Sequence, residues 1–304
     1  ELKQMVLKIF TVSGLLLVIA VFFTAINAYL FNRAVAGEID KLTGDAGNNT
    51  GKTVHNIDIS NLPEPVRKYF QYALKDQREI IRFVRLKQEG LFRLKDDPNL
   101  DENEGWSSLK AEQYFTTKEP EFIWCAEIKM APFLWIKGWD RYHQGEGNML
   151  WKMLSAIKIV DARDEMLNQG ALSRYLAETP WFPTALLPGD QLRWEAVNSN
   201  SAKAVLKDRD LKVSIIFHFN NQGQITHAEM PNRARMVDNQ YVSTPWTAYY
   251  RNYQEIDGMM IPTEGEVAWN LGSGNFSYAK LKITDIKYNF STTHRRLAHE
   301  ERIR

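Results

Sequence analysis

The sequence predicts a mainly β protein of the α+β class. We expect a large, curved antiparallel sheet, a half-barrel, that is covered by a few helices and preceded by one N-terminal transmembrane helix. Three observations predict this fold. Most of the chain beyond residue 120 alternates apolar and polar residues with a period of two. Short turns rich in Gly and Asn join neighbouring runs, as hairpins require. A long uncharged segment lies near the N-terminus.

The composition is that of a globular protein without nucleic-acid affinity. The chain has 304 residues, 44% hydrophobic and 25% charged, which is enough for one large domain with appendages. Lys and Arg number 38 against 37 Asp and Glu, so we expect no nucleic-acid partner. The aromatic share is 12%, including nine Trp. This share suits a β-rich fold, a lipid or carbohydrate site, or a membrane interface.

The N-terminal segment, residues 1–33, is predicted to be a transmembrane anchor. No residue from Ile9 to Asn32 is charged, and a helix of this length crosses a hydrocarbon core of about 30 Å. Lys3 and Lys8 precede it, which favours a single pass through the inner (cytoplasmic) membrane with an extracytoplasmic body. The alternative is a signal peptide cleaved after the Ala-Val-Ala sequence at 34–36. The apolar run exceeds the roughly 7–15 residues of a signal core, which favours the anchor.

The remaining chain divides into three parts. Residues 34–60 contain the polar, glycine-rich sequence GDAGNNTGKT and are predicted to form a flexible linker. Residues 61–290 are predicted to form the β domain, and the charged residues 291–304 a solvated tail. An amphipathic helix is expected to open the domain at 62–75, with Ser60 or Asn61 as its cap and Pro63 in its first turn. Its apolar face comprises Val66, Phe70, Ala73 and Leu74.

Strands follow this helix. The alternating runs lie at 121–128, 211–219, 264–271 and 278–290, and turns are expected at 220–223, 256–258 and 271–274. In the last run the apolar residues change from odd to even positions, which predicts a β-bulge near Thr284 and Asp285.

The segment Gly170–Gly189 is the clearest helical interruption of the strands. Arg174 and Glu178 are four residues apart and can pair on one helix face, and Pro180 and Pro183 end the helix. One interpretation is a cap packed over the sheet. The other is a lid over an apolar cavity.

Three stretches carry a resemblance to known proteins. NLPEPVRKYFQYAL, GALSRYLAETPWFPTAL and GMMIPTEGEVAW resemble an uncharacterised family of bacterial membrane-anchored proteins, a domain of unknown function, over residues 60 to 290. More remotely, the strand order and the IDGMMIP turn are similar to the LolA-like lipoprotein-carrier half-barrels. That resemblance implies a cavity for acyl chains that helices close. Carriers of that class are typically soluble in the periplasm, whereas this chain is predicted to keep a membrane anchor.

Local motifs for catalysis, cofactors and metals are absent from the sequence. The six histidines show no HExxH or close pairing, and no Walker, Rossmann or nucleophile-elbow pattern occurs. We therefore expect no cofactor, and no metal site with a local signature. The single Cys125 excludes an intrachain disulfide, and we expect it to be a packed thiol.

Three kinds of function are compatible with the sequence: a binding protein, an enzyme and a structural protein without a ligand. The first is binding of a lipid or other apolar ligand in the β cup, with Arg174 near a head group. The residues expected to line that site are Arg174, Glu178, Trp181, Phe182, Trp194, Trp246 and Tyr250. The second is an envelope hydrolase that uses Glu178 or Asp161 as acid or base. The third is a structural envelope protein with a filled core.

Overall fold

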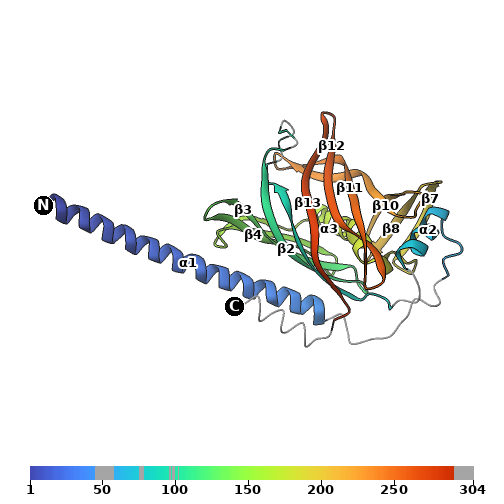
Figure 1. The fold of residues 1–304 in the computed structure, drawn as a ribbon, viewed down its shortest axis with the longest axis horizontal. Helices are drawn as coiled ribbons and strands as arrows, with labels where there is room; N and C mark the ends of the chain where they lie inside the picture. The colour runs from blue at the N-terminus through green and yellow to red at the C-terminus, as the bar shows by residue number, and fades with distance from the viewer. Residues whose placement is uncertain (45–57, 75–78, 96, 98–99, 102, 291–304) are drawn as a thin grey trace.

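A single antiparallel sheet dominates the protein (Figure 1). The computed structural model describes residues 1–44, 58–74, 79–95, 97, 100–101 and 103–290. Within them thirteen strands form the sheet in the order β6-β5-β4-β3-β2-β1-β13-β12-β11-β10-β9-β8-β7. The first six strands are Phe83–Arg93, Trp106–Thr116, Glu121–Ala131, Leu134–His143, Glu146–Met153 and Ile157–Ala162. The other seven are Leu192–Asn198, Ser201–Asp208, Leu211–Phe219, Ile225–Val237, Gln240–Ile256, Met259–Leu271 and Gly274–Tyr288. The predicted fold class is confirmed.

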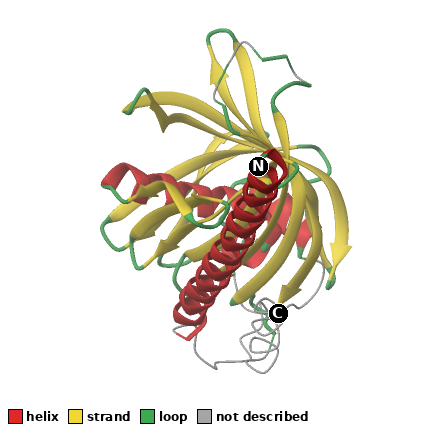
Figure 2. Ribbon diagram, turned by 90° about the vertical axis from the view of Figure 1, so that its left-hand side faces the viewer, coloured by secondary structure: helices red, strands yellow, loops and turns green. Residues whose placement is uncertain are grey.

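The strand order explains why a helix lies inside the curved sheet. β1 and β13 pair at the centre, so the chain runs outward to one edge at β6 and returns from the other edge at β7. The connection between the two edges crosses the concave face as α3, Glu165–Glu178. Figure 2 shows the strands curving around this helix. Tyr142 on β4 donates a buried hydrogen bond to Asp208 on β8 at 2.6 Å, which joins the two arms of the sheet.

The helix of the predicted lid begins earlier than expected, at Glu165, and ends before Pro180 as predicted. α3 starts after Asp164, whose side chain accepts a hydrogen bond from the Leu167 amide at 2.8 Å, and ends at Glu178. Two 3₁₀ turns follow, at Thr179–Trp181 and Pro183–Leu186, because each contains a proline that cannot continue the α-helical hydrogen bonds. Leu172, Leu176 and Phe182 are fully buried against the sheet. In the structure the segment is a packed element of the core.

The helix predicted at 62–75 is α2, Glu64–Ala73. Its N-cap is Pro63, with no side-chain capping bond, in place of Ser60 or Asn61. Val66 and Phe70 are buried in the core as expected, and Tyr69 joins them.

The β-bulge expected near Thr284 is confirmed. Lys87 on β1 pairs with Asp285, and the next residue, Gln88, pairs with Ile283, so that Thr284 is the extra residue. The expected turns at 220–223, 256–258 and 271–274 also form, between β9 and β10, β11 and β12, and β12 and β13. Gly223 adopts a φ of 86°, and a side chain there would collide with the Lys68 carbonyl of α2.

The N-terminal helix is longer than the predicted anchor. α1 runs from Leu2 to Gly44 and therefore includes residues 34–44, where the sequence predicts a flexible linker. Helix continues there because Val35 and Leu42 gain a packing surface on the outer face of the sheet. The rest of the predicted linker, from 45 to 57, and the predicted tail at 291–304 lie outside the described residues.

The docked part of α1 also changes the burial of β3. The alternation of β3 predicts one buried face, yet Ile123 and Cys125 on the opposite face are buried too. They pack in a second cluster with Phe31 and Val35 of α1. Cys125 is thus the packed thiol that the sequence predicts, and burial raises its pKa.

Candidate functional site

Arg174 is the centre of a buried polar group on the concave face. Its Nη1 lies 2.6 Å from a carboxylate oxygen of Asp140 on β4, and its Nε lies 2.9 Å from Glu178. The guanidinium also stacks on the rings of Trp124, at 4.5 Å, and Phe122, at 5.3 Å. The guanidinium of Arg174 therefore forms ion pairs with two carboxylates, those of Asp140 and Glu178.

Two glutamines extend this group along β1 and β2. Gln113 donates to Glu178 through Nε2 at 2.7 Å, and Gln88 accepts from the Trp124 indole at 2.9 Å. The other polar atom of each amide, Oε1 of Gln113 and Nε2 of Gln88, is buried and has no hydrogen-bond partner among the described residues. We call Gln88, Gln113, Asp140, Arg174 and Glu178 the Arg174 network.

Burial dominates the electrostatics of the network. Burial raises the pKa of Glu178 and that of Asp140, and the nearby Arg174 offsets only part of this effect. Asp140 also accepts a hydrogen bond from the Trp151 indole at 3.0 Å. Two ionised carboxylates would leave the network with a net negative charge, so protonation of one of them relieves a buried charge.

The half-buried side chains of Phe92, Trp269 and Tyr278, together with the buried Trp246, adjoin the network. Trp269 and Tyr278 stack at 5.9 Å, and Phe92 meets the edge of Tyr278 at 6.2 Å. Trp246 donates to the Tyr278 hydroxyl at 2.9 Å, and Arg233 stacks on Trp246 at 4.5 Å. We call these five residues the aromatic rim.

The rim and the network are electrostatic neighbours. Tyr278 interacts with Arg174, and Arg233 with Asp140. The position of Tyr278 results from a bulge, because Ala279 pairs with Val267 while Ser277 pairs with Ala268. The bulge leaves Tyr278 unpaired in the ladder and lets its ring pack against the core.

The residues expected to form the ligand site are separated by the structure. Arg174 and Glu178 belong to the network, and Trp246 belongs to the rim. Trp181 and Phe182 are buried in the core, where Phe182 packs on Phe115 at 4.6 Å.

Tyr250 and Trp194 also hold the lid segment in place. The Tyr250 hydroxyl donates to the Ala177 carbonyl at 2.6 Å, and the Trp194 indole donates to the Leu186 carbonyl at 2.9 Å. Asp161, the alternative acid or base, lies on the exposed edge strand β6, 2.8 Å from Lys158.

Sequence reasoning missed Asp140, the two glutamines and most of the rim. A usable signal exists for Gln88 and Gln113, because each is a polar residue on the buried face of its strand. Asp140 could be identified only from the register of β3 and β4, in which it pairs with Trp124.

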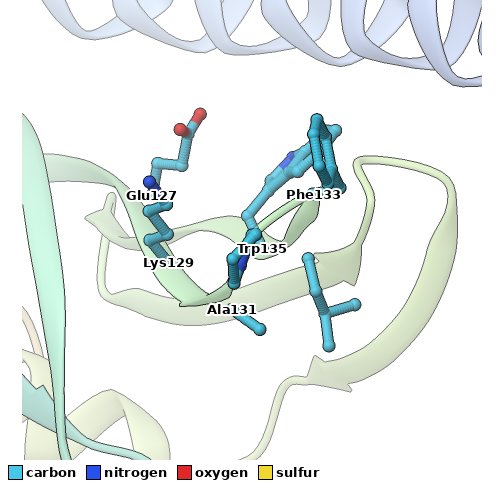
Figure 3. Close-up of a pocket in the computed structure, with 7 residues that line it drawn as sticks. Glu127, Lys129, Ala131, Phe133 and Trp135 are labelled. Carbon is cyan, nitrogen blue, oxygen red and sulfur yellow. The ribbon is translucent and has the colours of Figure 1, made fainter.

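A separate pocket of about 400 Å³ lies outside the cup, at the β3–β4 hairpin (Figure 3). Its lining residues are Glu127, Lys129, Ala131, Pro132, Phe133, Leu134 and Trp135. Figure 3 shows the side chains of Glu127 and Phe133 extending from the hairpin toward α1. Phe133 is 93% exposed.

Comparison with known proteins places the chain in a family. No curated protein matches it. Among solved structures, the LolA superfamily protein NE2245 from Nitrosomonas europaea is similar with a TM-score of 0.40 and 14% sequence identity, covering 76% of this chain and 94% of that one. A family of unknown function, DUF6920, matches residues 60–288. This match covers most of the sequence, and the chain belongs to the DUF6920 family.

Proposed function

We propose that this is a single-pass, membrane-anchored extracytoplasmic protein that binds a lipid-like ligand between the Arg174 network and the aromatic rim. One observation carries the proposal. Buried amide atoms of Gln88 and Gln113 have no partner among the described residues, and they belong to a network whose Arg174 interacts with Tyr278 of the aromatic rim. Buried polar atoms are nearly always hydrogen-bonded, so a bound polar group is an expected partner for these two atoms.

The network indicates which polar group is suitable. Gln88 offers a donor and Gln113 an acceptor, which together match a hydroxyl, amide or ester of a ligand. A free carboxylate is less suitable, because Asp140 and Glu178 already exceed the charge of Arg174. The aromatic rim supplies apolar area for the ligand's hydrocarbon part, and burial of each methylene contributes roughly 0.8 kcal/mol.

The geometry favours binding over hydrolysis. Glu178 is held by Arg174 and Gln113, and Asp161 is exposed on the edge strand, so the two carboxylates considered for catalysis lie in different environments. A hydrolase needs an acid and a base that converge on one bond. The scaffold without a ligand stays an outcome of the test described below.

Membrane attachment rests on α1. The helix is long and apolar enough to cross a membrane, and its side chains from Leu2 to Leu30 are largely exposed. A bilayer would cover this apolar surface. Lys3 and Lys8 before the uncharged segment support a cytoplasmic N-terminus and an extracytoplasmic body.

The β3–β4 hairpin adds a second membrane contact. We define the hairpin tip as residues 130–135. Figure 1 shows this end of β3 and β4 beside α1, on the N-terminal side of the body. Met130 and Phe133 are exposed there, Trp135 is half-buried, and Lys129 is adjacent. Aromatic and basic side chains of this kind are enriched where proteins meet the membrane interface.

Native mass spectrometry of the full chain, released from detergent micelles, tests the ligand proposal. We expect a co-purified lipid-sized adduct on the wild-type protein, and a reduced adduct population after Trp269→Ala. Trp106→Ala is the matched control, since Trp106 is also half-buried but packs under Arg93, at 4.4 Å, outside the rim. Bare wild-type protein, together with no uptake of a fluorescent acylglycerol probe, which carries hydroxyl and ester groups and no free carboxylate, would remove the proposal and leave the scaffold.

A further inference from the structure

Two histidines and one glutamate meet on neighbouring strands away from the Arg174 network. His218 on β9 pairs directly with His227 on β10, and Glu229 follows His227 by two residues, so that all three side chains share one face of the sheet. The two imidazoles stack at 4.1 Å with 7° between their planes. The turn at 220–223 creates this register, which the spacing of the histidines along the sequence does not reveal.

The distances bring three ligand atoms together. The Nε2 atom of His218 lies 3.0 Å from one carboxylate oxygen of Glu229, and that of His227 lies 3.7 Å from the other. The three groups offer ligand atoms that all lie within 4.8 Å of one another. Donors about 2 Å from a tetrahedral ion are about 3.3 Å apart, so a small adjustment suffices to bind one ion.

A neighbouring hydroxyl orients one of the imidazoles. The Oγ1 atom of Thr226 donates to the His218 carbonyl at 3.3 Å and lies 2.9 Å from Nδ1 of His227. Its oxygen can therefore accept a hydrogen bond from Nδ1–H of His227, and in this tautomer Nε2 of His227 carries the lone pair that is available to a metal ion. Metal-binding histidines usually have such a partner on the other ring nitrogen.

We propose that His218, His227 and Glu229 bind one Zn²⁺ ion. Two imidazole nitrogens and one carboxylate oxygen form a donor set typical of zinc sites that keep a fourth position open. The three side chains are 24%, 30% and 46% exposed, so water or an external ligand can reach that position. The site lies on the sheet rather than on α1 and does not depend on lipid binding.

Zinc titration of the full chain in detergent tests this site. The protein carries an affinity tag without histidines and is treated with a chelator before isothermal titration calorimetry with ZnCl₂. We expect one equivalent of Zn²⁺, and a visible d–d spectrum when Co²⁺ replaces it. His227→Gln and Glu229→Gln should abolish the stoichiometric binding, whereas His55→Gln should retain it. Circular dichroism of each chelated variant checks that the sheet is folded.

The hydroxyl has its own test. Thr226→Val should weaken zinc binding by roughly 10- to 100-fold without removing a ligand atom. Unchanged affinity in this variant would overturn the positioning role of Thr226. Absence of stoichiometric zinc binding by the wild-type protein, or equal binding by the His227→Gln and wild-type proteins, would overturn the site itself.

Discussion

Arg174 on α3 and Asp140 on β4 form a largely buried ion pair, with side chains 19% and 17% exposed and 2.6 Å between the guanidinium Nη1 and the carboxylate. The sequence places Arg174 beside Glu178 on one helix, where an exposed pair contributes only about 0.3–0.5 kcal/mol. In the structure the guanidinium of Arg174 instead connects the helix to the sheet. Its removal therefore leaves two buried carboxylates without their cation.

Substitutions of Arg174 and Glu178 should show whether Arg174 forms an exposed pair on the helix or a buried link between the helix and the sheet. Arg174→Met is expected to lower the free energy of unfolding by about 3–5 kcal/mol, the typical cost of breaking a buried ion pair. Glu178→Gln should cost about 1 kcal/mol or less, because its amide oxygen can still accept from Gln113. Urea denaturation of both variants measures the difference. Equally small losses would indicate a solvent-exposed pair.

The pH dependence of stability follows from the raised pKa values. Asp140 and Glu178 bind protons more readily in the folded protein than in the unfolded chain, where their pKa values are about 3.9 and 4.3. Their contribution to stability is therefore fully present below those values and is lost as the pH rises through the raised folded pKa values.

Comparison with a variant isolates this contribution. The unfolding free energy of the wild type minus that of Glu178→Gln should decrease as the pH rises from about 4 toward neutrality. Urea titrations at a series of pH values give both curves. A difference that increases with pH would mean that Glu178 is ionised at lower pH in the folded protein than in the unfolded chain.

The emission of one environment-sensitive fluorophore attached to the hairpin tip can test whether the tip contacts the bilayer. Cys125 is buried, so Phe133→Cys introduces an accessible thiol for an environment-sensitive label. In proteoliposomes of the full chain we expect blue-shifted emission and quenching by brominated lipids. Met236→Cys, at another exposed apolar position on β10, is the control and should emit as in water. Water-like emission from both positions would contradict the contact.

Trp181 should be essential for packing of the lid segment. It is 4% exposed, its ring lies 3.5 Å from where a Cβ atom of Gly265 would stand, and its carbonyl accepts from Tyr288 at 2.6 Å. We expect Trp181→Ala to lower the free energy of unfolding by about 3–5 kcal/mol and Trp181→Phe to lower it by much less. Thermal denaturation compares them. A wild-type melting temperature in the Ala variant would show that the ring contributes little to the core.

The sequence was sufficient for the class of fold and for several local details. Period-two alternation identified strands, and the change of phase near Thr284 located a real bulge, because both depend on neighbouring residues alone. The docking of α1 was not predictable in the same way. It depends on an outer surface, formed by Ile123 and Cys125, that exists only once the strands have paired.

The candidate site was predicted in part for the same reason. Arg174 and Glu178 were identified from helical spacing, whereas Asp140 reaches them through strand register across the sheet. Aromatic residues such as Phe182 were misleading, since a large apolar side chain is expected equally in a cavity wall and in a packed core.

With α1 in a membrane, as proposed, the docking of this helix on the sheet would limit how the body moves relative to the bilayer. Phe31 stacks on Trp139 at 5.2 Å, and Glu38 forms an ion pair with Arg141, so the last turns of the helix are held against the sheet by an aromatic contact and an ion pair. A body on a flexible tether could rotate freely and sample many distances from the surface. The tilt of the membrane-spanning helix would then set the height and orientation of the concave face, and a ligand could exchange only with molecules that approach that face in this orientation.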